Sequence, residues 1–192
     1  MPPPDRLLSA IDRFVHLWGE MASAWGINRT MAQLHALLYA TGTPLDTDAI
    51  MARLDISRGN ANVNLRQLVD WGLVGKVRLD GSRKDYFVAE QDVWALTATI
   101  IREREKRELR PVVAELDAVR ESLDAAASDE EHGLLERLDN LVGFVRLFGQ
   151  ASEALLPLLD ARNADLIAQL VYFAQRMAPT LPSAVPLPSD RS

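Results

Sequence analysis

Residues 57–72 read SRGNANVNLRQLVDWG, with the apolar spacing of a helix but four poor helix formers in the first two turns: Gly59, Asn60, Asn62 and Asn64. Together these residues disfavour a helix by roughly 2 to 3 kcal/mol relative to alanine. A helix that carries such a cost is expected to use the residues for something outside itself. The surrounding sequence indicates what that is.

Residues placed at 100° intervals divide this helix into two faces. One face is apolar and is predicted to be core: Ala61, Leu65, Leu68 and Val69. The other is polar and exposed: Gly59, Asn60, Asn62, Val63, Arg66 and Gln67. In the major groove of DNA, Asn and Gln pair with adenine, Arg pairs with guanine, and apolar groups contact the thymine methyl. The polar face therefore predicts a base-reading surface, with Ser57 and Arg58 at the helix start contacting phosphate.

The flanking sequence supplies the other parts of a winged helix-turn-helix. Helices are expected at 6–25, from a Thr30 cap to about residue 40, and from an Asp46 or Thr47 cap to a turn at Asp55; Ser57 caps the fourth. After Gly72 the period changes to 2, in the runs GKVRL and KDYFVAE, which predict a β-hairpin. The hairpin carries four cations: Lys76, Arg78, Arg83 and Lys84. The expected fold is mainly α, with this unit at 26–91.

Charge distribution favours a nucleic-acid partner more than the net charge of −6 does. From Arg53 to Lys84 there are seven basic and three acidic residues, a local balance of +4, which leaves −10 for the remainder. There is no cysteine, and the three histidines are far apart, so no metal site or cofactor is expected. The motifs of phosphate-binding loops, nucleophile elbows and zinc proteases are missing, so catalysis is not expected.

Residues 92–177 are predicted to be helical, and 1–5 and 178–192 to be unordered ends. Pro111 should kink or split the first helix near Arg110. Ser128 and Glu131 fit a capping box for a helix that runs to Phe148. One or two helices follow from 152 to 177, with Pro157 near the first turn of one. No apolar run approaches a membrane span and no signal peptide is evident, so a cytoplasmic protein without a membrane partner is expected.

The helices outside 26–91 have apolar faces too large for one winged helix to cover: Leu7, Ile11 and Phe14; Leu96 and Ile100; Leu134, Leu138, Leu141 and Val145. They predict a homodimer, which would read a pseudo-palindromic operator. Residues 102–110 (REREKRELR) predict a solvated helix face with i,i+4 pairs rather than a second DNA site. Trp18, Trp25 and Trp94 suggest an aromatic cage for a quaternary ammonium effector, with core or dimer packing as the alternative.

The block ISRGNANVNLRQLVDWGLVGKV, followed by GSRKDYFVAE, resembles the GbsR branch of the MarR-type transcriptional regulators. The segment from Gly26 to Tyr39 is similar as well, and the resemblance covers roughly residues 10 to 125. It implies a dimeric bacterial regulator, some relatives of which sense choline-like osmolyte precursors. It also implies residues on the DNA-reading helix, namely Ser57, Arg58, Asn60, Asn62, Asn64 and Arg66, and residues in the wing, namely Arg83 and Lys84. Arg83 is expected either to enter a minor groove or to be a solvated turn residue.

The sequence thus predicts a sequence-specific, homodimeric DNA-binding regulator, with repression as the expected outcome and a small molecule as a possible control. Two other hypotheses stay open. A winged helix can serve as a protein–protein interaction module, which the overall acidity favours. The chain could also be a small-molecule binding protein with a vestigial DNA head.

Overall fold

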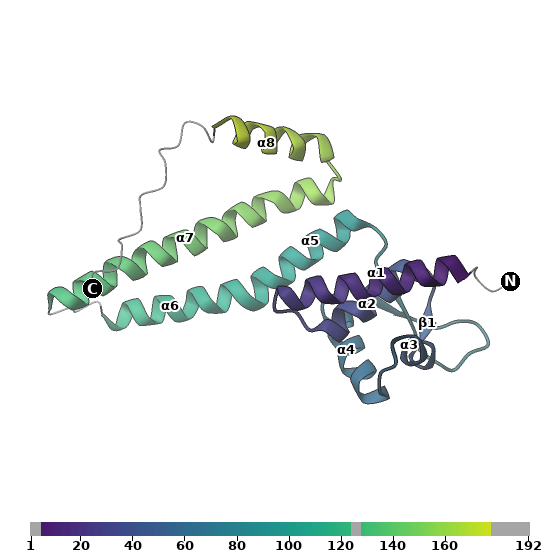
Figure 1. Cartoon of the computed structure of the whole chain (residues 1–192). Coiled ribbons are helices and arrows are strands. Elements are labelled where there is room, and N and C mark those ends of the chain that lie inside the picture. The colour runs from purple at the N-terminus through teal and green to yellow at the C-terminus, as the bar shows by residue number, and fades with distance from the viewer. Residues whose placement is uncertain (1–4, 124–127, 178–192) are drawn as a thin grey trace, which may run out of the picture.

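The computed structural model describes residues 5–123 and 128–177. The described part of the chain is mainly helical (77%), with one antiparallel three-stranded sheet. Figure 1 shows two regions, a cluster at one end that contains the helices α1 to α4, and the helices α5, α6 and α7, which extend away from it. We call residues 5–89 the winged-helix head and residues 93–123 with 128–177 the helical arm. Residues 1–4 and 178–192, predicted to be unordered, lie outside the described residues, and Asp5 already belongs to the first helix.

The winged-helix head contains four helices and three short strands. In chain order they are α1 (Asp5–Ala24), α2 (Arg29–Thr41), β1 (Leu45–Asp46), α3 (Thr47–Leu54), α4 (Arg58–Asp70), β2 (Val74–Val77) and β3 (Tyr86–Ala89). The strand order is β1-β3-β2, with Leu45 opposite Phe87 and Val74 opposite Ala89. The predicted hairpin is confirmed. β1 was not predicted, because two residues are too few to show a period of 2.

Side-chain caps set the helix starts of the head. Asp46 accepts a hydrogen bond from the amide of Ala49 (2.8 Å) and begins α3. Ser57 accepts one from the amide of Asn60 (3.3 Å) and begins α4. Both caps were predicted. The cap predicted at Thr30 is wrong: Asn28 caps α2 by accepting from the amide of Met31 (3.0 Å), and the helix has already begun at Arg29.

Leucine and isoleucine side chains from three helices form the centre of the head. The largest fully buried ones are Leu34, Leu37, Leu38, Ile50, Leu65 and Leu68. Each contributes about 1.5–3 kcal/mol relative to an exposed side chain. Ala61 is buried beside them and Val69 is half-buried, so the predicted core face of α4 is confirmed. Asp55, at φ 51°, makes the tight turn that sets α4 against α3.

The first helix packs closely along α2. A Cβ at Gly19 would lie 2.6 Å from Cγ of Gln33, so any other residue there would force the Gln33 side chain to move. Glycine at this position therefore lets the two helices approach. The contact buries Ile11 and Val15 and attaches α1 to the core of the head.

The helical arm contains α5 (Val93–Arg104), the π-helical turn η1 (Glu105–Leu109), α6 (Arg110–Ser122), α7 (Asp129–Asp160) and α8 (Ala164–Met177). The predicted interruption near Arg110 is the π-helical turn, in which the amide of Arg110 donates to the carbonyl of Glu105. Pro111 has no amide hydrogen, and its ring displaces the carbonyl four residues earlier, which accounts for the widened turn.

The long helix α7 begins at the predicted capping box. Ser128 accepts from the amide of Glu131 (3.2 Å), and Glu131 accepts from the amide of Ser128 (3.0 Å). The predicted end at Phe148 is wrong, because α7 continues through Gly149 to Asp160. One glycine disfavours a helix by only about 1 kcal/mol, which is too little to end it. Pro157 lies in the last turns of α7 and not, as predicted, near the start of another helix.

The exposed apolar surface of α7 has a second implication. By length and composition alone this helix could cross a membrane, and only 6% of its most apolar 18-residue stretch is buried. A single helix of this kind is weak evidence for a span, because packed helices of soluble proteins have the same length and composition. This helix has no uninterrupted apolar run of that length, so the sequence pattern did not predict it.

Candidate nucleic-acid interface

The outward face of α4 carries polar side chains that the rest of the protein does not use. Asn62, Arg66 and Gln67 are exposed and make no hydrogen bond or ion pair within residues 5–123 and 128–177. Val63, between them, is 56% exposed. These groups can therefore meet a partner without first breaking internal contacts.

A groove of about 550 Å³ separates this face from the wing. It is lined by side chains of the α3 start, α4, β2 and the β2–β3 loop, among them Asn62, Arg66, Lys76, Arg83 and Lys84. Helix α4 and the wing thus border one surface, although these groove residues are up to 22 positions apart in the chain. The sequence predicted these residues separately, and the fold places them together.

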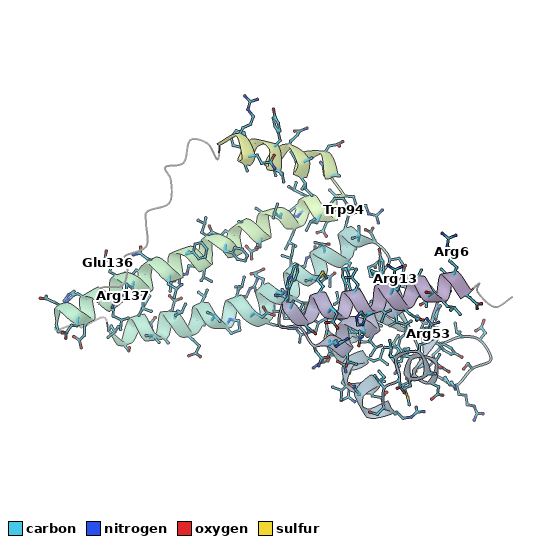
Figure 2. All side chains as sticks on the ribbon, in the orientation of Figure 1. Arg6, Arg13, Arg53, Trp94, Glu136 and Arg137 are labelled. Carbon is cyan, nitrogen blue, oxygen red and sulfur yellow. The ribbon has the colours of Figure 1, made fainter. Side chains whose placement is uncertain are left out.

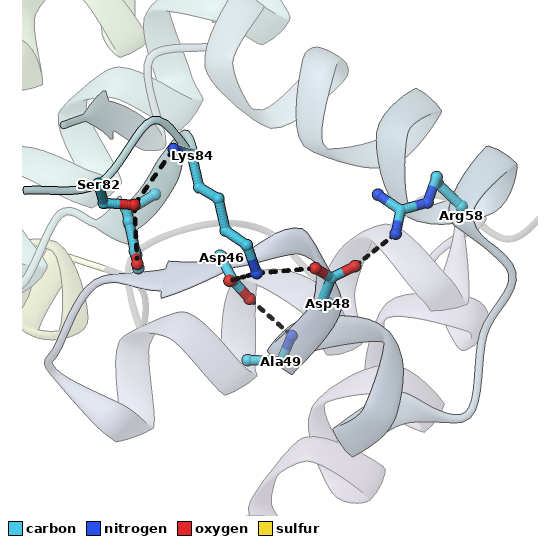
Figure 3. Close-up of polar contacts among 7 residues, drawn as sticks. Asp46, Asp48, Ala49, Arg58, Ser82 and Lys84 are labelled. Carbon is cyan, nitrogen blue, oxygen red and sulfur yellow. Dashed lines mark hydrogen bonds and ion pairs between the residues drawn. The ribbon is translucent and has the colours of Figure 1, made fainter. Parts of the chain in front are cut away.

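Lys84 links the wing to the start of α3 (Figure 3). Its Nζ lies 2.6 Å from Oδ2 of Asp46 and 2.8 Å from Oδ2 of Asp48, and Asp48 also pairs with Arg58. Hydrogen bonds to Asp46 and then Asp48 raise the pKa of Lys84 above its ordinary value. The Lys84 hydrogen bond in turn holds the pKa values of Asp46 and Asp48 below theirs. All three groups are therefore charged at neutral pH.

The other cations of the hairpin share one carboxylate. Nζ of Lys76 lies 2.8 Å from Asp85, and Nε of Arg78 lies 3.9 Å from it. Arg83 is exposed and, like Arg66, has no ion pair within the described part of the chain. The cations of this surface thus form two classes, those paired with aspartate and those without such a partner.

Three aspartates of this surface were missed: Asp46 and Asp48 as partners of Lys84, and Asp85 as the partner of Lys76. The basic segment was counted from Arg53 to Lys84, one residue short of Asp85. From Asp46 to Asp85 there are seven basic and six acidic residues, so the local balance is +1. The pairing of Asp46 with Tyr86 in the β1–β3 ladder brings the α3 start beside the wing, and that ladder gave no sequence signal.

The expectation for Asn64 needs correction. Asn64 lies on α4, but it is only 2% exposed and faces the core. Its Nδ2 donates to the main-chain oxygen of Asn60 (2.8 Å) and to Oδ1 of Asn60 (2.7 Å). Helical geometry explains this, because position 64 is three residues from Ala61 and four from Leu68, both on the buried face. Asn64 is not placed to touch DNA.

The three tryptophans proposed as a cage are in different environments. Trp18 packs against Phe14 of its own helix, with ring centroids 5.6 Å apart and the ring planes tilted by 37°, and Trp25 is 71% exposed beyond α1. Trp94 is half-buried at the start of α5 (Figure 2). No ring contact joins any two of them among the residues that the structure describes. In this structure they do not form one aromatic cluster.

The charged run 102–110 has the expected i,i+4 pairs. Arg107 lies 2.6 Å from Glu103, and Arg104 lies 3.7 Å from Glu108. Arg107 also donates to the main-chain oxygen of Asp70 (3.0 Å) and lies over the ring of Trp71, 5.6 Å from its centroid. This residue connects the π-helical turn of the arm to the end of α4.

Four of the apolar residues expected in a dimer contact are used inside the chain. Ile11 and Leu96 are buried, and Phe14 and Ile100 pack against the core of the head. Three others of the expected set, Leu7, Leu134 and Leu141, remain exposed. Most of the other exposed large apolar side chains lie on the same two helices and on α8: Leu17 of α1; Phe144, Leu147, Phe148 and Leu155 of α7; Leu166, Leu170, Val171, Tyr172 and Phe173 of α8.

Comparison with known proteins identifies the fold. No protein-family model matches the sequence, and no curated protein matches it. Among solved structures, one described as the crystal structure of a transcriptional regulator has a TM-score of 0.60 and 19% identity, covering 77% of this chain and 96% of that one. A mutant of MarR from E. coli gives a TM-score of 0.34 and 15% identity, covering 93% of this chain and 98% of that one. The first likeness supports the winged-helix fold, and the second superposition is too loose to add to it.

Proposed function

We propose that this protein regulates transcription by binding double-stranded DNA sequence-specifically as a homodimer. The observation that supports this most directly is the unpartnered polar face of α4 beside a wing that carries the unpaired Arg83. Amides and a guanidinium in this arrangement can pair with base edges in a major groove. The wing can meanwhile contact the backbone or the adjacent minor groove.

The homodimer is proposed from the apolar surface of the arm. One recognition helix covers only a few base pairs, so regulators of this type gain affinity by pairing two heads. Many apolar side chains of α7, α8 and α1 are exposed. Large exposed apolar patches of this kind usually mark a site of interaction with a partner. A second copy packed on them would place two heads on one pseudo-palindromic operator.

The finer assignments are also proposals. The residues 57–72 and the wing sequence GSRKDYFVAE support a place among MarR-like regulators, and specifically in the GbsR branch. On that basis we propose a bacterial, cytoplasmic repressor. Repression would follow simply from occupancy of an operator that overlaps a promoter.

The DNA-binding proposal is tested by gel shift on the DNA upstream of the protein's own coding sequence, over a series of salt concentrations. Binding should weaken as salt increases, because counterions are released from neutralised phosphates. Arg66→Ala should lose about 1–3 kcal/mol on the operator and relax specificity at one position. Arg6→Ala, on α1, is the matched control and should bind like the wild type. Absence of salt-dependent binding would contradict the proposal and favour the protein-interaction hypothesis.

Control by a small molecule is tested separately. Quaternary ammonium compounds such as choline should quench or enhance the fluorescence of Trp18, Trp25 or Trp94 if any of these rings binds the cation. Each tryptophan is replaced in turn by phenylalanine to identify the ring concerned. An effector must also change operator affinity, since allostery is a coupling between two binding events. Ligands that alter neither signal would leave constitutive binding as the function.

A further inference from the structure

The buried amide of Asn64 is not explained by packing. It lies on the core face of α4 with Ala61, Leu65 and Leu68, and its Oδ1 has no hydrogen-bond partner within the described residues. An unpaired buried oxygen is unfavourable, and a leucine at this position would avoid that penalty. Asparagine is also a weak helix former. The contacts of its other amide atom indicate a use.

Those contacts fix the orientation of two side chains. A main-chain carbonyl can only accept a hydrogen bond, so the atom of Asn64 that lies 2.8 Å from the carbonyl of Asn60 must be Nδ2. The same nitrogen lies 2.7 Å from the side chain of Asn60, and because it can only donate, the atom it meets must be Oδ1. The acceptor half of the Asn60 amide is therefore turned toward the helix.

The donor half of Asn60 is left for a partner. The residue is exposed, and its Nδ2 has no hydrogen bond within residues 5–123 and 128–177. It lies in the first turn of α4, the part of a recognition helix that contacts base edges. A base that meets Asn60 therefore meets two N–H groups before it meets an acceptor.

We propose that Asn64 is a positioning residue that sets the base preference of Asn60, an inference that rests on the proposed DNA-binding function. In the major groove guanine presents two adjacent acceptors, O6 and N7, and thymine presents the acceptor O4, whereas adenine places the N6 donor beside its N7 acceptor and cytosine presents the N4 donor. Bidentate pairing with adenine, the usual choice of asparagine, needs Oδ1 to face the base. With Oδ1 held by Asn64, Asn60 selects a keto base, guanine or thymine.

Selection from a random duplex library tests this with three proteins: the wild type, Asn64→Leu and Asn64→Asp. The wild type should enrich guanine or thymine at the position that Asn60 contacts in each half-site. In Asn64→Leu the Asn60 amide can rotate, so the preference at that position should fall on the order of tenfold while other positions keep theirs. In Asn64→Asp the carboxyl accepts from Nδ2 of Asn60, which turns the amide over and should favour adenine or cytosine.

Two controls separate positioning from a general effect on the fold. In an Asn60→Ala background, Asn64→Leu should change no base preference, because the side chain through which it acts is gone. His35→Leu makes the same kind of substitution at another buried polar residue with an unpartnered nitrogen, in α2, and should leave every base preference unchanged. Thermal unfolding of each variant reports stability. Asn64→Asp places a carboxyl in the core, and if it does not fold, Asn64→Leu carries the test alone.

Three results would overturn the inference. Asn64→Leu could weaken binding to all sequences equally, or it could change a base preference in the Asn60→Ala background. The wild type could also enrich adenine at the position that Asn60 contacts, which is the position whose preference is lost in Asn60→Ala. Failure of the proposed function is a different result, in which the folded wild type enriches no sequence at all.

Discussion

The winged-helix head and the helical arm are both built from amphipathic helices, but they use their apolar faces differently. In the head, the large side chains of α2, α3 and α4 are fully buried against one another. In α7, only Val142 and Leu159 of 32 residues are buried, whereas Phe144 and Leu147 are 65% and 63% exposed. The head completes its core within one chain, and the arm does not.

The contacts inside the arm are correspondingly polar. Ion pairs join the α5–α6 segment to α7 and the residues just after it: Asp92 with Arg162, Arg102 with Asp160, Arg110 with Glu153, Asp117 with Arg146, and Arg120 with Asp139. Exposed pairs of this kind contribute about 0–1 kcal/mol each. They fix which helices lie side by side, but they leave the apolar face of α7 without a partner. An amphipathic pattern therefore identifies an apolar face, but not whether the same chain buries it.

Replacing one leucine in each region should distinguish a buried apolar face from an exposed one, and it has the largest expected effect on the free energy of unfolding. Leu38→Ala removes a fully buried side chain from the head and should lower the free energy of unfolding by about 2–5 kcal/mol. Leu147→Ala, on the exposed face of α7, should change it by less than about 0.5 kcal/mol at concentrations where the protein is monomeric. Urea denaturation of both variants at high dilution measures the difference. Equal losses would mean that α7 packs within its own chain.

The head should also be the acid-sensitive region. Burial lowers the pKa of His35 from 6.5 to about 4, because no partner in the described part of the chain stabilises its charged form. Between these values the unfolded chain binds a proton that the folded chain does not. Stability is therefore unaffected above pH 6.5, falls as the pH decreases to 4, and should have lost about 3 kcal/mol there.

Chemical denaturation at pH 7, 5.5 and 4 measures this slope. His35→Leu should flatten it over that range, while His16→Gln, on the exposed face of α1, should leave it in place. The lowered pKa values of Asp46 and Asp48 act in a different range, since stability from these carboxylates is lost only below their ordinary value of 3.8. An unchanged slope in His35→Leu would show that another group of the head titrates.

Much of the head could be predicted from the sequence, because its determinants are local. The caps at Asp46 and Ser57, the turn at Asp55 and the apolar face of α4 all follow from residue types at fixed short spacings. The same reasoning placed Asn62, Arg66 and Gln67 on the outer face. The part of the site that depends on one helix was therefore predictable.

The rest of the site depends on contacts distant in sequence. The ion pairs of Lys84 require the two-residue strand β1, which has no periodicity to detect. Asn64 was assigned to the DNA-reading set by resemblance, although its spacing from Ala61 and Leu68 puts it on the core face. In the arm, Gly149 and Pro157 suggested helix ends that α7 does not have, because one glycine, or one proline in the last turns, costs too little to end a helix.

The proposed dimer can be tested directly by measuring the mass of the protein in solution. Leu147→Glu places a charge on the exposed apolar face of α7, and if a second copy covers that face, the dissociation constant should rise by roughly tenfold or more. Leu79→Glu, at an exposed leucine in the wing, is the matched control and should not change the mass. Light scattering during size-exclusion chromatography reports both. A monomer at micromolar concentration in the wild type would contradict the dimer.

The smallest expected effect is a difference between the two cation classes of the wing in the salt dependence of DNA affinity. Arg83 has no ion pair in the described part of the chain, so a phosphate that it neutralises releases a counterion, and Arg83→Ala should reduce the slope of log affinity against log salt by about 0.9. Lys84 is already neutralised by Asp46 and Asp48, so Lys84→Ala should reduce the slope by less.

Fluorescence anisotropy with a non-specific duplex over a salt series measures both slopes, and Asp48→Asn supplies the reciprocal variant. Removing that carboxylate leaves Arg58 without its partner and Lys84 with one instead of two, so the slope should become steeper than in the wild type. Equal reductions for Arg83→Ala and Lys84→Ala would mean that DNA displaces the aspartates. The aspartates would then occupy the place of phosphate only in the free protein, and both classes of cation would contact phosphate in the complex.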